Sequence, residues 1–305
     1  MNRNSSGIAY GIGAYIIWGL LPLYWRWLDR ASAFEILANR AVWSLLVCIL
    51  FLAYQKQLRS TLTLIKNARS FSLLAFTSLL LSINWGIYIW SVSVDRVVEA
   101  ALGYYITPLV AVSFGVLVLK EKLRRLQVIS VVLAAIGVVI LTLTYGHVPL
   151  IALGLAFSWG SYSLMKKRLN AGALETLSVE TLVSFLPSLT FLIVLMSKKE
   201  AEFGQDIGFS LALASAGIFT VAPLLMFNAA TTRLPLTITG LLQYITPSIM
   251  FLIGIIVFNE PLSVSKLIGF LFIWVALGFL GRDLPEGAAK EGLKNLTFAL
   301  VNRST

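Results

Sequence analysis

The chain has 305 residues, of which 58% are hydrophobic and only 12% are charged. Charged residues make up about a quarter of an average soluble domain, so this composition excludes a protein whose surface lies mainly in water. The net charge of +10 comes from Lys and Arg residues spread over many short segments. That distribution excludes the concentrated basic face, with interleaved aromatic residues, that binds nucleic acid. We therefore expect an integral membrane protein surrounded by the lipid bilayer.

Ten apolar segments are long enough to cross a membrane. A bilayer core about 30 Å thick takes roughly 20 helical residues to cross, because each backbone polar group must find its partner within the helix. In chain order the segments are 7–26, 35–54, 71–93, 98–119, 125–144, 148–166, 176–197, 209–230, 236–258 and 264–281. The longest polar stretch between them is 55–70. The predicted fold is therefore an all-α integral membrane fold with ten transmembrane helices.

An internal duplication is visible in the tetrapeptide Tyr-Ile-Thr-Pro, which occurs at residues 105–108 and 244–247. At this offset of 139, residues 102–129 and 241–268 share ten identities in 28 positions. Chance in so apolar a composition would give about three. The predicted organisation is a first five-helix repeat at 1–146, a second at 147–282 and a cytoplasmic tail at 283–305.

The distribution of positive charge indicates the orientation. With a cytoplasmic N-terminus, seventeen of the 24 Lys and Arg residues fall in cytoplasmic segments and six in outside segments. The loop Lys120–Arg125 has four basic residues around Glu121, whereas the equivalent segment Asn259–Val264 has none around Glu260. Five helices per repeat place these two segments on opposite sides of the membrane. The positive-inside rule therefore favours inverted repeats with both termini in the cytoplasm.

Polar and aromatic side chains gather in three of the predicted spans and mark a candidate substrate cavity. They are Asn84, Trp85, Tyr88 and Trp90 in the third span, Tyr104 and Tyr105 in the fourth, and Gln243 and Tyr244 in the ninth. Tyr104 and Gln243 are equivalent in the two repeats, and each lies about 10 Å inside its span. We expect such a pair near the membrane midplane, where transporter sites form between repeats. The alternative is that these residues only make hydrogen bonds between helices.

Four charged residues within the spans are candidates for ion coupling or for ion pairs, because a charge exposed to lipid is costly. They are Glu35, Arg40, Glu99 and Glu180. Arg40 and Glu99 lie in the same leaflet and are predicted to form an ion pair or a water-bridged contact, unless Arg40 extends to the outer interface. Glu180 is equivalent to Arg40 and so lies in the opposite leaflet. If protons drive transport, Glu99 is the first candidate to carry them, and Glu180 is the next.

Pro108 and Pro247 occupy matched positions in the two repeats, and each removes a backbone donor in mid-helix. We expect either a hinge that lines the cavity and moves or a fixed kink that packing accommodates. The pairs Trp18-Gly19 and Trp159-Gly160 also recur. Their glycines are expected to let helix backbones approach closely.

The composition also limits the chemistry. Cys48 is the one cysteine and His147 the one histidine, so we predict no disulfide within a monomer, no metal site and no cofactor. The acids occur without the histidine or serine-lysine partners that catalysis would need. Transport of a small-molecule solute is the leading hypothesis. The alternatives are an integral-membrane enzyme and a non-transporting membrane receptor or assembly protein, and either a monomer or a homodimer is compatible with the sequence.

Six motifs together carry a resemblance to a known family. They are Tyr15 to Gly19, Glu35 to Arg40, Asn84-Trp85 with Ile89-Trp90, Glu99 to Leu109, Glu180-Thr181, and Gln243 to Pro247. With these motifs the chain resembles the EamA family of the drug/metabolite transporter superfamily, and within it the RarD-like branch. The resemblance covers residues 7–281, and Glu99 to Leu109 is its most specific part.

This resemblance implies two inverted five-helix repeats without an ATP-binding domain. It implies export of small metabolites or drug-like molecules from the bacterial cytoplasm across the inner membrane, and RarD-like proteins are associated by name with chloramphenicol. The residues that it places in or beside the central cavity are Asn84, Trp85, Tyr88, Glu99, Tyr104, Gln243 and Tyr244.

Overall fold

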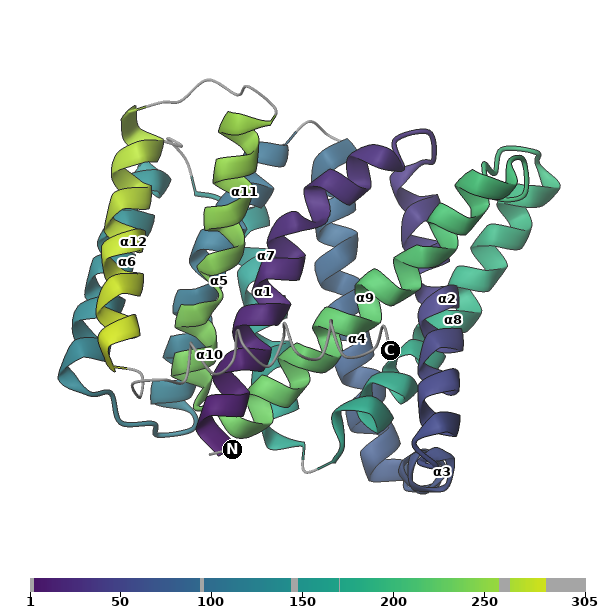
Figure 1. Cartoon of the computed structure of the whole chain (residues 1–305), viewed down its shortest axis with the longest axis horizontal. Helices are drawn as coiled ribbons and strands as arrows, with labels where there is room; N and C mark the ends of the chain where they lie inside the picture. The colour runs from purple at the N-terminus through teal and green to yellow at the C-terminus, as the bar shows by residue number, and fades with distance from the viewer. Residues whose placement is uncertain (1–2, 94–95, 144–147, 170, 258–263, 284–305) are drawn as a thin grey trace, which may run out of the picture. The chain divides into compact units, whose positions relative to one another are not determined.

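The part of the chain that the structure describes is built from helices. The computed structural model describes residues 3–93, 96–143, 148–169, 171–257 and 264–283. Its helices are α1 (Arg3–Trp27), α2 (Ala33–Tyr54), α3 (Leu58–Lys66), α4 (Ala68–Ser93), α5 (Val97–Leu117), α6 (Arg125–Leu143), α7 (Leu150–Arg168), α8 (Ala173–Ser197), α9 (Ile207–Arg233), α10 (Leu236–Leu242), α11 (Ile245–Ile256) and α12 (Val264–Asp283) (Figure 1). No strand occurs within these ranges, which confirms the all-α prediction for them. His147, Glu260 and all but the first residue of the predicted tail lie outside the described residues.

Each of the ten predicted segments coincides with a helix, and the ninth is divided in two. Gln243 and Tyr244 separate α10 from α11 within the predicted span. Within the described residues, eight helical segments are long and apolar enough to cross a membrane, and one of them, Leu236–Ile256, joins α10 and α11. Neither α7 nor α12 is among the eight. The eight candidate spans support a membrane fold, and the number of ten crossings stays a prediction.

The short helix α3 was not predicted, because its segment was expected to be a polar connection. Thr61 is buried in it, while Leu58 and Leu62 are exposed. α3 packs against α8, and the Ser60 hydroxyl donates a hydrogen bond to Glu175 at 3.3 Å. Its nine residues are too few to cross a bilayer, so α3 adds no span.

The chain divides into two compact units. Unit 1 comprises Met1–Leu20, Asn84–Arg168 and Met226–Thr305, and unit 2 comprises Leu21–Ile83 and Leu169–Leu225. Helices α1, α4 and α9 each contribute residues to both units. Each unit therefore draws on both halves of the sequence.

In unit 1, helices approach each other closely over glycines. α5 packs against α7 and α10, and α6 packs against α12 (Figure 1). A methyl group on Gly160 of α7 would lie 2.7 Å from Val110 of α5, and one on Gly19 of α1 would lie 2.7 Å from Ile249 of α11. Only a residue without a side chain fits at such a distance. The predicted packing role is confirmed for the glycines of both Trp-Gly pairs.

In unit 2, α2 and α8 lie side by side (Figure 1). A buried apolar cluster of this unit consists of Leu28, Ala31, Phe209, Ala212 and Leu213. The Tyr24 hydroxyl donates a hydrogen bond to the Ala212 carbonyl at 2.6 Å beside this cluster. The polar end of Tyr24 is thereby satisfied while its ring packs on the cluster.

Candidate functional site

Five aromatic side chains form one group in unit 1. This aromatic cluster consists of Tyr15 and Trp18 of α1, Trp159 and Tyr162 of α7, and Phe227 of α9. Trp18 and Trp159 meet edge to face with their ring centroids 5.3 Å apart. Tyr15, Tyr162 and Phe227 are buried, whereas the two tryptophans are only partly buried. None of these five residues was among the predicted site residues, although the recurrence of the Trp-Gly pairs was a signal for the cluster.

Three buried polar groups in unit 1 have no hydrogen-bond partner among the described residues. They are the indole N–H of Trp159, the side-chain amide of Asn228 and the hydroxyl of Tyr244. Asn228 is 1% exposed and Tyr244 is 0% exposed. An unpartnered buried polar group costs about 1–3 kcal/mol, so each such group in a native protein calls for an explanation, for example a ligand or a water molecule. Trp159 belongs to both sets, and we call the aromatic cluster together with Asn228 and Tyr244 the candidate solute site.

The structure brings some of the predicted cavity residues together. Tyr88 of α4 and Tyr104 of α5 meet edge to face with their ring centroids 6.3 Å apart. Asn84 of α4 instead joins α7, because its amide donates hydrogen bonds to the Leu155 carbonyl and the Ser158 hydroxyl, each at 2.9 Å. The contacts of Asn84 therefore match the alternative in which the polar residues hold helices together.

The other predicted cavity residues have different surroundings. Tyr105 packs edge to face on Phe270 of α12, with ring centroids 5.2 Å apart. Trp85 is partly buried, and Trp90 is 53% exposed. Gln243 is 8% exposed and caps the C-terminus of α10. The meeting of Tyr104 with Gln243, its equivalent in the second repeat, stays a prediction.

The two matched prolines lie in different settings. Pro108 lies in the middle of α5, which continues through it. Pro247 is the third residue of α11, just after the turn at Gln243 and Tyr244, where backbone hydrogen bonds span three residues instead of four. A first-turn N–H has no partner within its helix, so proline is tolerated there. The expected mid-helix position is thus wrong for Pro247, and the hinge role of either proline stays a prediction.

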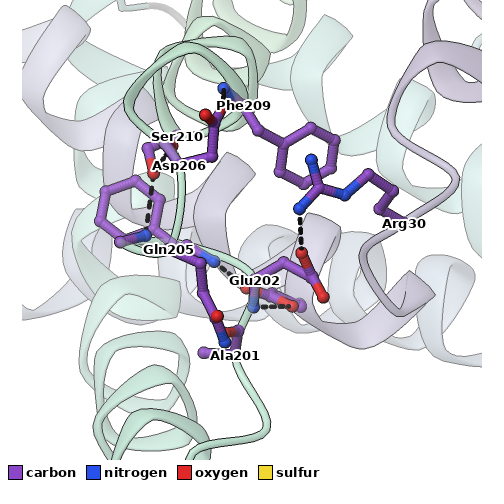
Figure 2. Close-up of polar contacts among 10 residues, drawn as sticks. Arg30, Ala201, Glu202, Gln205, Asp206, Phe209 and Ser210 are labelled. Carbon is purple, nitrogen blue, oxygen red and sulfur yellow. Dashed lines mark hydrogen bonds and ion pairs between the residues drawn. The ribbon is translucent and has the colours of Figure 1, made fainter.

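Glu35 holds a loop of unit 2. Its two carboxylate oxygens accept hydrogen bonds from the backbone N–H groups of Glu202, at 3.2 Å, and Phe203, at 2.8 Å. Arg30 forms an ion pair with Glu202 at 2.8 Å, and its guanidinium lies 4.5 Å from the centre of the Phe209 ring (Figure 2). Glu35 is 1% exposed, and these contacts connect the loop before α2 with the loop before α9.

Arg40 has two partners within unit 2. Its Nε donates a hydrogen bond to the Thr220 hydroxyl at 2.9 Å, and its guanidinium lies 5.0 Å from the centre of the Trp25 ring. Glu99 belongs to unit 1, so the predicted contact between Arg40 and Glu99 is a contact between units and stays a prediction.

Glu99 lies in the first turn of α5 and is 1% exposed. One carboxylate oxygen accepts a hydrogen bond from the backbone N–H of Ile151, at 2.8 Å, and the other lies 3.6 Å from Arg96. Ile151 is the second residue of α7, whose first N–H groups have no partner within the helix. Glu99 therefore caps α7.

Glu180 is a third buried acid, at 2% exposed, on α8 in unit 2. The Thr77 hydroxyl lies 2.6 Å from one carboxylate oxygen, and the Ser78 hydroxyl donates to the Glu180 carbonyl at 2.9 Å. Cys48 of α2 lies beside Glu180, Ser178 and Thr181. Among the described residues, no group of three or more His, Cys, Asp or Glu side chains could hold a metal ion.

Two further charged residues hold the turn between α9 and α10, and they were not among the predicted site residues. The carboxylate of Glu121 accepts hydrogen bonds from the backbone N–H groups of Leu236, at 2.7 Å, and Thr237, at 2.9 Å. The Lys167 ammonium donates to the Leu234 carbonyl. In this turn of unit 1, the negative carboxylate thus binds the two backbone N–H donors, and the positive ammonium binds the backbone carbonyl acceptor.

Comparison with known proteins identifies the family of the chain. The chain matches the model of the EamA-like transporter family at residues 5–143 and again at 148–282. It is 44% identical over 291 residues to Protein RarD of Streptomyces exfoliatus, covering 95% of this chain and 92% of the relative. It is also 44% identical over 280 residues to the uncharacterized transporter YojE of Bacillus subtilis (strain 168), covering 90% of this chain and 93% of the relative.

A solved structure, described only as the crystal structure of a protein, has the same fold. It superimposes with a TM-score of 0.72 at 19% identity, over 92% of this chain and 98% of the other. The relatives point to a membrane transporter and not to an enzyme. Together with the eight apolar helices, they indicate a multi-pass protein of the bacterial inner membrane. The chain belongs to the EamA-like transporter family.

Proposed function

We propose that the chain is a secondary transporter that exports a small organic solute across the bacterial inner membrane by alternating access. Membership of the EamA-like transporter family supports transport of a solute. The family resemblance supports export and the absence of an ATP-binding domain. Alternating access requires a solute site that opens to one side of the membrane at a time. In many transporters, two repeats of opposite orientation build such a site.

We propose ten membrane crossings in two inverted repeats, at 1–146 and 147–282, with both termini and the tail at 283–305 in the cytoplasm. The two matches to the family model, at 5–143 and 148–282, support this division.

The packing of unit 1 supports the inverted repeats independently. Gly19 of α1 meets Ile249 of α11, and Gly160 of α7 meets Val110 of α5. Val110 and Ile249 are 139 residues apart, which is the offset of the repeat. The same close approach therefore occurs twice, once with each repeat supplying the glycine.

The observation that carries the solute assignment is the combination of aromatic rings and unpartnered polar groups in unit 1. The rings of Trp18 and Trp159 offer apolar faces, and the N–H of Trp159 offers a donor. Asn228 offers a donor and an acceptor, and Tyr244 offers a hydroxyl. The side chains of this set are uncharged, and the ammonium of the buried Lys166 lies 5.8 Å from the centre of the Tyr162 ring. These groups suit an uncharged, amphipathic aromatic solute that carries both donors and acceptors.

The remaining predicted cavity residues extend the proposed site. They are Asn84, Trp85, Tyr88, Trp90, Tyr104, Tyr105 and Gln243. Protons are the proposed coupling ion, and the candidates to carry or balance them are Glu35, Arg40, Glu99 and Glu180. The functional form is a monomer or a homodimer.

Flux into proteoliposomes tests the proposal. Radiolabelled chloramphenicol is a suitable probe, because it is an uncharged aromatic molecule with hydroxyl and amide groups. We expect purified protein to accelerate its equilibration across the membrane above the rate of protein-free vesicles, with the probe recovered unchanged. We also expect the probe to raise the melting temperature of the protein in detergent, since it binds the folded state. Recovery of a modified probe would favour the enzyme alternative. The absence of both flux and binding would reject chloramphenicol-like molecules as solutes.

A further inference from the structure

Four acids that make hydrogen bonds within the fold differ in the kind of partner that their carboxylates face. Glu35, Glu99 and Glu180 are buried, and Glu121 is partly buried. Glu35 and Glu121 each accept two backbone N–H groups, one on each oxygen. Glu99 faces one backbone N–H and the guanidinium of Arg96. Backbone N–H and guanidinium groups can only donate. A proton added to any of these three carboxylates would therefore find no hydrogen-bond acceptor among these partners.

Glu180 faces a partner that can both donate and accept. The Thr77 hydroxyl lies 2.6 Å from a Glu180 carboxylate oxygen and 2.9 Å from the Leu74 carbonyl oxygen. The hydroxyl has one proton, so it cannot donate to both oxygens at once. If Glu180 is protonated, it donates to Thr77, and Thr77 donates to Leu74. All three groups are then satisfied without any movement of the helices.

We propose that Glu180 is the site that binds the transported proton, a role that rests on the function proposed above. One proton from water on one side of the membrane forms the O–H bond of the carboxyl group. That bond breaks when the proton is released to water on the other side. Thr77 stabilises both states because its hydroxyl reverses its role from donor to acceptor. Thr77 lies on α4, the helix that also carries Asn84 and Tyr88, so a change at the acid has a covalent route to proposed cavity residues.

Hydroxyls and a thiol from two neighbouring helices lie beside Glu180. α4 contributes Thr77 and Ser78, and α2 contributes Cys48. Arg40 also lies on α2, but eight residues before Cys48, which is about 12 Å along the helix. On α8, the nearest acid is Glu175, which is bound by Ser60 of α3.

Infrared spectroscopy tests proton binding without any solute. The C=O stretch of a protonated carboxylic acid is separate from the amide bands, so it can be followed as the pH of the purified protein is changed. We expect a titrating band that Glu180→Gln removes and that Glu200→Gln, which changes an exposed acid outside the proposed sites, leaves in place. A wild-type protein without a titrating band, or a band of full intensity in Glu180→Gln, would overturn the proposal.

A second pair of variants keeps the test decisive if Glu180→Gln does not fold. Thr77→Val removes the hydroxyl with almost no change in shape, and Thr77→Ser keeps it. We expect Thr77→Val to move the pH midpoint of the band and Thr77→Ser to leave it near that of the wild type. Equal midpoints in all three proteins would overturn the assignment of Thr77 and Glu180.

Flux of the chloramphenicol probe then tests coupling. In Glu180→Gln vesicles, a pH gradient should no longer drive accumulation of the probe, while exchange of labelled for unlabelled probe continues. Gradient-driven accumulation at the wild-type level would overturn the coupling role. If no protein, including the wild type, moves the probe, the proposed solute class fails, and the infrared result still decides the proton site.

Discussion

Trp18 and Trp159 occupy equivalent positions in the two halves of the sequence and meet edge to face, with ring centroids 5.3 Å apart. Each tryptophan is followed by a glycine that brings its helix against a neighbour. The tight packing of Gly19 and Gly160 therefore fixes where the two rings lie. The pair differs in one respect, because only the N–H of Trp159 is both buried and unpartnered among the described residues.

This difference predicts unequal effects for the same substitution. Trp159→Phe should weaken binding of the chloramphenicol probe about 3- to 10-fold, since one hydrogen bond contributes about 0.5–1.5 kcal/mol. Trp18→Phe keeps an aromatic ring and removes no buried donor, so its effect should be smaller. Equilibrium binding to the purified variants measures both. Equal losses in the two variants would show that the rings, and not the Trp159 donor, determine affinity.

The side-chain amide of Asn228 should lower the free energy of unfolding of the solute-free protein. Both ends of the buried Asn228 amide lack a partner in the part of the chain that the structure describes. Asn228→Leu should therefore raise the free energy of unfolding by about 1 kcal/mol while it reduces flux. Asn84→Leu is the matched control, since the Asn84 amide makes two hydrogen bonds and its loss should lower stability by about 1–3 kcal/mol. Thermal unfolding in detergent and flux in vesicles check both. A less stable Asn228→Leu protein would mean that the amide has a structural partner.

Glu121 should control the opening of α10. Its carboxylate binds the N–H groups of Leu236 and Thr237, the first two residues of that helix. Glu121→Ala should therefore speed hydrogen exchange at both amides and lower stability by about 1–2 kcal/mol. Glu200→Ala removes an exposed acid from the loop before α9 and should change neither. Unchanged exchange at Leu236 and Thr237 in Glu121→Ala would exclude this role.

The positions of the helices could be predicted from the sequence because membrane crossing imposes a length and a composition on each segment. Contacts between helices could not be predicted in the same way. Trp18 and Trp159 are 141 residues apart, and no local periodicity indicates that they meet. The repeat indicates only which positions are equivalent in the two halves. From equivalence alone, a contact between Tyr104 and Gln243 was predicted, and a contact between the two tryptophans was not.

Asn228 is a residue that the sequence analysis missed although a signal was present. It lies within the predicted span 209–230, and a polar amide inside an apolar span is a functional candidate by default. For Glu99 and Glu180, the residues could be predicted from the sequence, but their hydrogen-bond partners could not. Both were recognised as acids in spans, but only the structure distinguishes an acid that faces backbone N–H groups from one that faces a hydroxyl.

The proposed orientation places the loop around α3 in the cytoplasm and the loop between α8 and α9 outside. In a Cys48→Ala background, Ser60→Cys and Lys198→Cys each introduce one exposed thiol. A membrane-impermeant maleimide added to intact spheroplasts should label the cysteine at position 198 and not the one at position 60. Both should be labelled after the membrane is permeabilised. The reverse pattern in intact spheroplasts would invert the topology.

The two prolines should have unequal effects on transport because only one of them adjoins a break. α10 and α11 are separated at Gln243 and Tyr244, and Pro247 cannot donate to the Gln243 carbonyl four residues earlier. Pro247→Ala restores that donor, so it should favour one continuous helix over residues 236–256. α5 already continues through Pro108, so Pro108→Ala should change its path less.

If the break between α10 and α11 bends during each transport cycle, Pro247→Ala should slow flux more than it weakens equilibrium binding of the probe. Pro108→Ala should slow flux less, and Pro187→Ala, within α8 and without an equivalent in the repeat, should have little effect on either quantity. Flux and binding measured on the same three preparations separate movement from affinity. Equal flux in the wild type and in Pro247→Ala would show that the break is a fixed feature of packing. A parallel loss of flux and binding would show that Pro247 stabilises the solute site and is not part of a hinge.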